Sequence, residues 1–185
     1  LLTIGFFVCG FQLGFITIHL PSYINSLGLD YGVAATSLAL IGGFNIIGSL
    51  LAGAAGQRWS KSKGLSFIYL SRGIVIVGLL LLPKTEFIIY IFAATMGFTW
   101  LSTVPLTSAI IAQVFGLKYM ATLFGVVFFS HQLGSFIGIW LGGKLFDETG
   151  SYDTVWWLGA MLGFGAAFIH WLIDERPLER LSIVK

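Results

Sequence analysis

Residues 119–145 read YMATLFGVVFFSHQLGSFIGIWLGGKL, and this stretch contains a single charged residue, Lys144. A helix of this length is about 40 Å long, which exceeds the ~30 Å of hydrocarbon in a bilayer. Gly134, Gly138 and Gly142 recur at four-residue spacing, a ridge that is typical of close helix packing in membranes. We therefore expect this stretch to form a helix that crosses a membrane.

The rest of the chain has the same character, with 57% hydrophobic residues, 10% charged residues and a mean hydropathy of +0.93. A soluble domain cannot bury that much apolar surface, so the solvent of this chain is the lipid bilayer. The sequence predicts an all-α integral membrane protein with six transmembrane helices, at residues 3–26, 31–57, 64–82, 87–113, 119–145 and 154–173.

The distribution of cations predicts the orientation, because Lys and Arg are retained on the cytoplasmic side. Only Lys84 and Lys144 fall on one side of a six-span arrangement. The other side carries Arg58, Lys61, Lys63, Lys118, Arg176, Arg180 and Lys185. Both ends of the segment are therefore expected in the cytoplasm. The net charge of +2 gives no indication of a nucleic-acid partner.

An internal repeat relates the second span to the fifth at an offset of 86 residues, although chance accounts for some of the matches. The matches pair Ala35 and Thr36 with Ala121 and Thr122, Gly48 and Ser49 with Gly134 and Ser135, Gly56 with Gly142, and Arg58 with Lys144. Two units of three spans have opposite orientations, so the sequence predicts an inverted 3+3 repeat. Asn45 then corresponds to His131, and both polar residues lie about midway through a span.

The chain resembles the major facilitator superfamily over essentially its whole length, and specifically the last six of the usual twelve helices. Gly53, Gln57, Arg58, Ser60 and Lys61 have the spacing of that superfamily's loop signature. Gln57 and Ser60 replace its acidic residue and second glycine, which puts a gating salt bridge at this loop in doubt. The chain starts at Leu1 without a Met, so we expect it to be a fragment whose N-terminal six-helix partner is missing.

The region from Phe115 through His131 and Gln132 to Tyr152 is similar more particularly to bacterial monocarboxylate and oxalate/formate porters. The resemblance implies a multi-pass protein of the bacterial inner membrane. Monocarboxylate members carry an aspartate and an arginine where this chain has Asn45 and Ser49, so neither of those roles transfers.

Polar residues within spans are candidates to line a pathway, because they are costly in lipid. His131, about 18 Å into its span and so close to the midplane, is the leading candidate for substrate orientation or proton linkage. The other candidates are Gln132, Asn45, Gln12, His19, Tyr23, Trp100, Thr103 and Arg72. For Gln12, His19, Tyr23 and His131 the alternative is hydrogen bonding between helices, and for Thr103 it is a hydrogen bond to the backbone of its own helix. For Arg72 the resemblance favours a structural role, or one snorkelling to the surface, over anion binding.

The sequence predicts a secondary carrier of a small organic solute, with a monocarboxylate or similar anion suggested by the resemblance. A carrier of another solute class and a non-transporting receptor or scaffold on the same fold are the alternatives. We expect no enzyme, no metal and no cofactor, since the chain has no phosphate-binding loop, nucleophile elbow or metal-ligand pair. Pro21 and Pro105 lie within spans, where each permits either a functional bend or a static kink.

Overall fold

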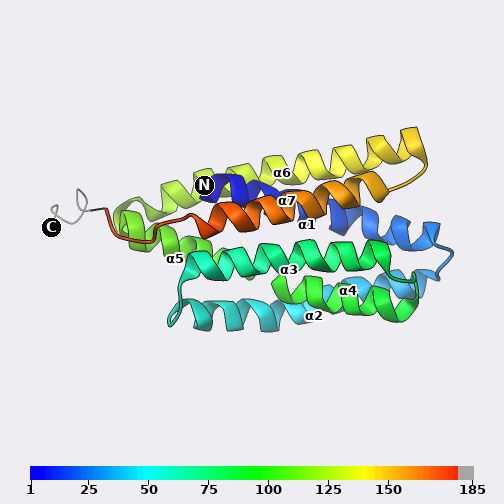
Figure 1. Cartoon of the computed structure of the whole chain (residues 1–185), viewed down its shortest axis with the longest axis horizontal. Coiled ribbons are helices and arrows are strands. Elements are labelled where there is room, and N and C mark those ends of the chain that lie inside the picture. The colour runs from blue at the N-terminus through cyan, green and yellow to red at the C-terminus, as the bar shows by residue number, and fades with distance from the viewer. Residues whose placement is uncertain (179–185) are drawn as a thin grey trace.

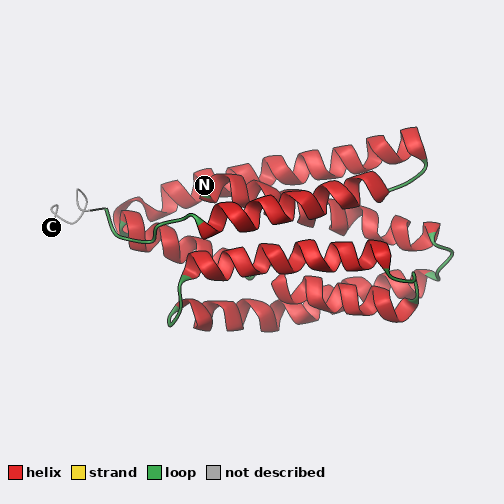
Figure 2. Cartoon of the chain, viewed as in Figure 1, coloured by secondary structure: helices red, strands yellow, loops and turns green. Residues whose placement is uncertain are grey.

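The computed structural model describes residues 1–178, which fold into seven α-helices and one 3-10 turn (Figure 1). Within the described residues Figure 2 shows helices and loops only. The elements are α1 (Leu2–Ser26), α2 (Tyr31–Gly56), α3 (Lys61–Leu81), α4 (Glu86–Thr99), α5 (Thr103–Phe115), η1 (Leu117–Tyr119), α6 (Met120–Thr149) and α7 (Asp153–Trp171). The all-helical fold class predicted from the sequence is confirmed.

Five of the expected spans have the length and apolar composition needed to cross a membrane. They are α1, α2, α3, the α4–α5 segment Glu86–Phe115, and the η1–α6 segment Leu117–Thr149. The sixth, α7, forms a helix of 19 residues as predicted but is not among these five. Asp153 in its first turn and His170 in its last reduce its apolar character. It lies alongside α1 and α3 (Figure 1).

The fourth span departs from the prediction of one helix over 87–113. The chain leaves the helical path at Trp100 and re-enters it at Thr103, so that α4 and α5 are separate helices. Pro105 explains this break, because it has no N–H with which to bond the carbonyl of Leu101. Val104 donates to that carbonyl instead, at 3.0 Å, in a tighter turn.

The fifth span also ends later than expected. Asp147 and Glu148, predicted in a loop, belong to the last turn of α6. The helix stops at Gly150, whose φ of 69° is the left-handed conformation that ends many helices. At the other end of the bundle α3 starts at Lys61, because the side chain of Ser60 accepts a hydrogen bond from the Lys63 amide and caps it.

The helices pack as two equivalent units, α1–α3 and α4–α7. Helix α1 lies along α6, the α4–α5 segment lies along α2, and α3 lies along α7. Successive spans run in opposite directions (Figure 1), so each helix of one unit is antiparallel to its counterpart in the other. The packing therefore has the form of the inverted repeat that the sequence predicts.

Close glycine contacts place this repeat in a definite register. A Cβ on Gly134 would strike the carbonyl oxygen of Phe7, and a Cβ on Gly48 would strike that of Phe98. Gly142 meets the ring of Phe15, and Gly56 meets the side chain of Leu106. In each of these two comparisons the two glycines are 86 positions apart in the sequence, and the two residues that they contact are 91 positions apart. The matching glycines of the sequence are thus among the points where the helix pairs approach closely.

Candidate functional site

Arg72 on α3 is a fully buried cation, with none of its surface exposed. Its guanidinium does not snorkel to the membrane surface, which corrects that part of the expectation. Nη2 donates to the carbonyl oxygens of Thr99 and of Trp100, the latter at 2.6 Å, and Nε lies 3.4 Å from Thr99 Oγ1. Arg72 therefore contacts the end of α4, at the break in the fourth span.

The remaining donors of Arg72 point to α1. Nη1 lies 3.3 Å from Cys9 Sγ and 3.5 Å from Gln12 Oε1. The guanidinium carbon also lies 5.5 Å from the ring centroid of Tyr69. No carboxylate among the described residues lies within ion-pair distance of Arg72. Among the described residues, neutral oxygen and sulfur atoms and the Tyr69 ring surround this charge.

Gln12 and Thr103, both candidates, belong to the same buried cluster as Arg72. Gln12 Nε2 donates to the carbonyl of Gly159 on α7 at 2.9 Å, and Thr103 Oγ1 lies 3.5 Å from Cys9 Sγ. Gln12 is 1% exposed and Thr103 is fully buried. Both side chains thus link helices to one another in this structure.

Asn45 lies on the opposite side of the α4–α5 break. Its Oδ1 accepts a hydrogen bond from the backbone amide of Leu101 at 3.0 Å and another from Ser49 Oγ at 3.2 Å. Trp100, between these contacts, is half-buried and contributes its carbonyl to Arg72. Asn45 of α2 and Arg72 of α3 therefore both bind the break that contains Trp100.

His131 and Gln132 lie on the partly open face of α6. The imidazole of His131 is half-buried, stacks on Phe128 with ring centroids 5.6 Å apart, and lies 5.4 Å from Phe6. Its Nδ1 is 3.4 Å from Oε1 of the exposed Gln132. This pair keeps hydrogen-bonding capacity that is not committed to the interior of the bundle.

His19 and Tyr23 lie farther along α1, in an aromatic cluster with Phe15, Tyr152 and Trp156. Nε2 of His19 lies 2.9 Å from the carbonyl oxygen of Ile139 on α6. The buried hydroxyl of Tyr23 has no hydrogen-bond partner among the described residues. His19 thus joins α1 to α6, as the alternative interpretation expects.

The loop motif lies at the end of α2. Gln57 and Arg58 are exposed, Lys61 starts α3, and Gly53 faces Pro105 at van der Waals distance. Arg58 and Lys61 form no ion pair within residues 1–178. The gating salt bridge that Gln57 puts in doubt is not seen among these residues.

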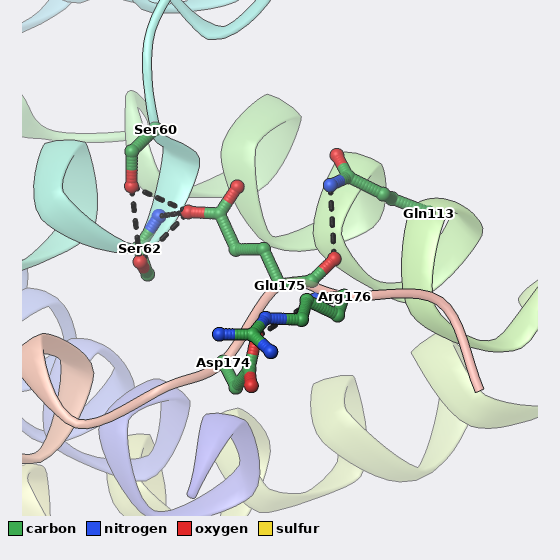
Figure 3. Close-up of polar contacts among 6 residues, drawn as sticks. All are labelled: Ser60, Ser62, Gln113, Asp174, Glu175 and Arg176. Carbon is green, nitrogen blue, oxygen red and sulfur yellow. Dashed lines mark hydrogen bonds and ion pairs between the residues drawn. The ribbon is translucent and has the colours of Figure 1, made fainter.

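A carboxylate from the C-terminal segment binds beside this loop, as Figure 3 shows. Glu175 Oε1 accepts hydrogen bonds from Ser60 Oγ at 2.6 Å and from the amide and hydroxyl of Ser62, both at 2.7 Å. Gln113 donates to the Glu175 carbonyl at 2.9 Å. The segment after α7 therefore fastens the start of α3 to the end of α5.

The hydrogen bonds also change the acidity of Glu175. Partial burial by itself would raise the pKa of its carboxyl group, but the bonds from Ser60 and Ser62 outweigh burial and lower the pKa to about 2. No sequence motif identifies Glu175. The only signals are the capping serine ahead of α3 and the acidic pair after α7.

Two cavities lie at opposite ends of the bundle. One, of 360 Å³, is bordered by Tyr23, Lys84, Tyr152, Asp153 and Trp157, among others, and the second, of 340 Å³, lies between the starts of α1 and α6 and the end of α5. Of the sequence candidates only Tyr23 borders either one. Within residues 1–178 no three His, Cys, Asp or Glu side chains could share a metal ion.

Comparison with known proteins agrees with this architecture. The chain is 29% identical to the "Uncharacterized MFS-type transporter YcxA" of Bacillus subtilis (strain 168), an alignment that covers 82% of the chain and 38% of that protein. It is 24% identical to monocarboxylate transporter 12-B of Danio rerio, over 89% of the chain and 37% of the relative. Human monocarboxylate transporter 12 is 25% identical over 89% of the chain and 32% of its own length.

The chain therefore spans about a third of the length of these relatives. Residues 2–183 match the Major Facilitator Superfamily. This match covers nearly the whole chain and agrees with the helical repeat. The chain belongs to the major facilitator superfamily.

Proposed function

We propose that this chain is the C-terminal six-helix half of a secondary transporter that moves a small organic anion of the monocarboxylate type by alternating access. The observation that carries the proposal is membership of a transporter superfamily, together with relatives named as monocarboxylate transporters. The second half of the carrier is then an N-terminal bundle, and the site lies between the two. We place both ends of this segment in the cytoplasm, from the distribution of its cations.

The repeat supports a site near the midplane of the bilayer. Asn45 and His131 occupy equivalent positions in the two antiparallel units, and carriers built from such repeats bind substrate where the units meet. The side-chain oxygen of Asn45 already accepts a hydrogen bond from the Leu101 amide at the break in the fourth span. His131, with its half-buried ring and the exposed Gln132 beside it, is the better candidate to contact a carboxylate.

His131 is also the residue we propose for proton linkage. The acidic residues of the described helices lie at helix ends: Glu86 starts α4, Asp147 and Glu148 end α6, and Asp153 starts α7. An imidazole exchanges a proton near physiological pH, so His131 can couple anion entry to a proton without a carboxylate at mid-depth.

The test uses the full-length protein in proteoliposomes and measures uptake of labelled lactate, pyruvate, formate and oxalate with and without a pH gradient. We expect saturable uptake of at least one anion, at least tenfold slower in His131→Ala. His131→Gln should keep part of the uptake but lose its response to the gradient. Thr122→Ala, on the exposed face of α6, is the matched control.

Absence of uptake of all four anions by folded, inserted protein would contradict the monocarboxylate proposal. It would favour another solute or a receptor role. Undiminished uptake by His131→Ala would return His131 to helix packing.

A further inference from the structure

The break between α4 and α5 follows from one missing hydrogen-bond donor. Pro105 cannot bond the carbonyl of Leu101, so Val104 bonds it instead, at 3.0 Å, and Trp100 bonds the carbonyl of Gly97, at 2.9 Å. These tighter bonds leave the carbonyls of Thr99 and Trp100 without a backbone donor among the described residues. They also leave the amide of Leu101 without a backbone acceptor there.

Side chains from two other helices satisfy these groups. Arg72 on α3 donates to both carbonyls, and Asn45 on α2 accepts from the Leu101 amide. Ser49, one turn after Asn45, holds the amide oxygen by donating to it. Inside a bilayer no water replaces such partners, so the break is stable only while both side chains stay in place.

Arg72 is fully occupied by this role. The five N–H bonds of its guanidinium have five acceptors in the protein: Thr99 Oγ1, the two carbonyls, Cys9 Sγ and Gln12 Oε1. No donor remains for an anionic substrate in this state. Arg72 therefore stabilises the break between α4 and α5, and any effect that it has on substrate is indirect.

The repeat offers an internal comparison. Helix α1 is the counterpart of the α4–α5 segment and is unbroken from Leu2 to Ser26. The offset of 91 residues that relates these helices pairs Pro105 with Gly14, and applied to α3 and α7 it pairs Arg72 with Gly163. The unbroken helix α1 and its neighbour α7 thus lack the proline and the cation at these equivalent positions. This agreement indicates that Pro105 and Arg72 belong to one device.

We propose that residues 100–102 form a hinge in the fourth span, with Arg72 and Asn45 as positioning residues that hold α4 and α5 at a defined angle during transport. The role of the hinge during transport rests on the proposed transport function. Its structural part, the coupling of Arg72 and Asn45 to the break, does not require a substrate.

The test is a double-mutant cycle in the full-length protein. Arg72→Met removes the donors, and Pro105→Ala restores the N–H that allows a continuous helix. We expect Arg72→Met to accelerate amide hydrogen exchange across residues 99–104 at least tenfold. In the double variant that acceleration should fall below threefold, because the helix then satisfies its own carbonyls. Pro21→Ala, in the unbroken α1, is the matched control and should give no such rescue.

If Arg72→Met does not fold, a second double-mutant cycle combines Asn45→Ala with Pro105→Ala. Asn45→Ala should accelerate exchange at Leu101 and should likewise be rescued by Pro105→Ala. Ser71→Ala, which removes only a bond from Ser71 to its own helix, should leave exchange at the break unchanged. Additive effects in both cycles would overturn the proposal.

Transport kinetics then test the role of the hinge. We expect Arg72→Lys and Asn45→Ala to lower the maximal rate at least fivefold with KM changed less than twofold. An increased KM at an unchanged maximal rate would instead assign these residues to substrate binding. If the wild type carries none of the four anions but the hydrogen-exchange cycle shows coupling, the substrate proposal fails and the coupling of Arg72 and Asn45 to the break remains. If transport is normal and the cycle is additive, the hinge fails alone.

Discussion

Gly134 on α6 lies directly against the carbonyl oxygen of Phe7 on α1, and the space between them does not admit a methyl group. Gly48 on α2 has the same relation to the carbonyl oxygen of Phe98 on α4. Backbone atoms form both contacts, so neither can be relieved by rotation of a side chain. The two contacts fix the spacing of the α1–α6 and α2–α4 pairs, each of which joins one unit to the other.

Gly134→Ala should therefore destabilise the protein by ~3 kcal/mol, the upper end of the cost of overpacking, because backbone must move to admit the methyl group. Gly125→Ala, on the same helix with open space around it, should be neutral or stabilising by about 0.5–1 kcal/mol. Thermal unfolding of the full-length protein in mild detergent measures the difference. Equal midpoints for the two variants would contradict the packing described here.

The α2–α4 pair provides an independent version of this experiment. Gly48→Ala should cost about as much as Gly134→Ala, ~3 kcal/mol, because the repeat places both glycines against a carbonyl. Gly43→Ala, on an exposed part of α2 with no neighbour within 4 Å, is its control. A large loss for only one of Gly48→Ala and Gly134→Ala would show that the α2–α4 and α1–α6 pairs do not pack alike.

Much of this architecture could be predicted from the sequence because it depends on local composition. Apolar length predicts the spans, and the glycines of the repeat predict the close helix contacts. The break at Trp100 could not be predicted in the same way, because a proline in a membrane helix is compatible with a simple kink. What makes the break stable is Arg72, on a different helix and 28 residues from Trp100.

The candidate site was predictable in part. Burial of polar groups in lipid pointed to Gln12, Asn45 and Arg72, but their partners are set by helix packing. Glu175 was missed because its partners lie 113 and 115 residues away and no motif relates them. Whether His131 contacts a substrate stays a prediction.

Gln12→Leu should destabilise the protein by ~1–3 kcal/mol, because it leaves one N–H of the buried Arg72 without a partner and removes the hydrogen bond from Gln12 to the Gly159 carbonyl. The matched change Gln113→Leu removes a bond from an exposed side chain to the Glu175 carbonyl and should cost less than about 1 kcal/mol. Unfolding midpoints of the two variants give the comparison. A smaller loss for Gln12→Leu than for Gln113→Leu would argue against the buried cluster.

Glu175 should make stability depend on pH at acidic values. Its pKa in the folded protein is lowered from 4.5 to about 2, so its contribution is complete above the ordinary pKa and is lost as pH falls toward 2. Glu175→Gln should therefore lower the thermal midpoint at pH 7 and flatten its decline between pH 5 and 3. Asp174→Asn, which removes the exposed partner of Arg176, is the control and should change the profile little. A wild-type profile retained in Glu175→Gln would exclude this carboxylate as the cause.

The measurement that tests the transport account most directly is counterflow. Proteoliposomes that contain the full-length protein are loaded with unlabelled lactate or pyruvate and diluted into a trace of the labelled anion. A carrier that exposes one site alternately to each side should accumulate label transiently above equilibrium, and His131→Ala should reduce that overshoot. Label that only equilibrates, or does not enter at all, through folded and inserted protein would contradict alternating access for these anions.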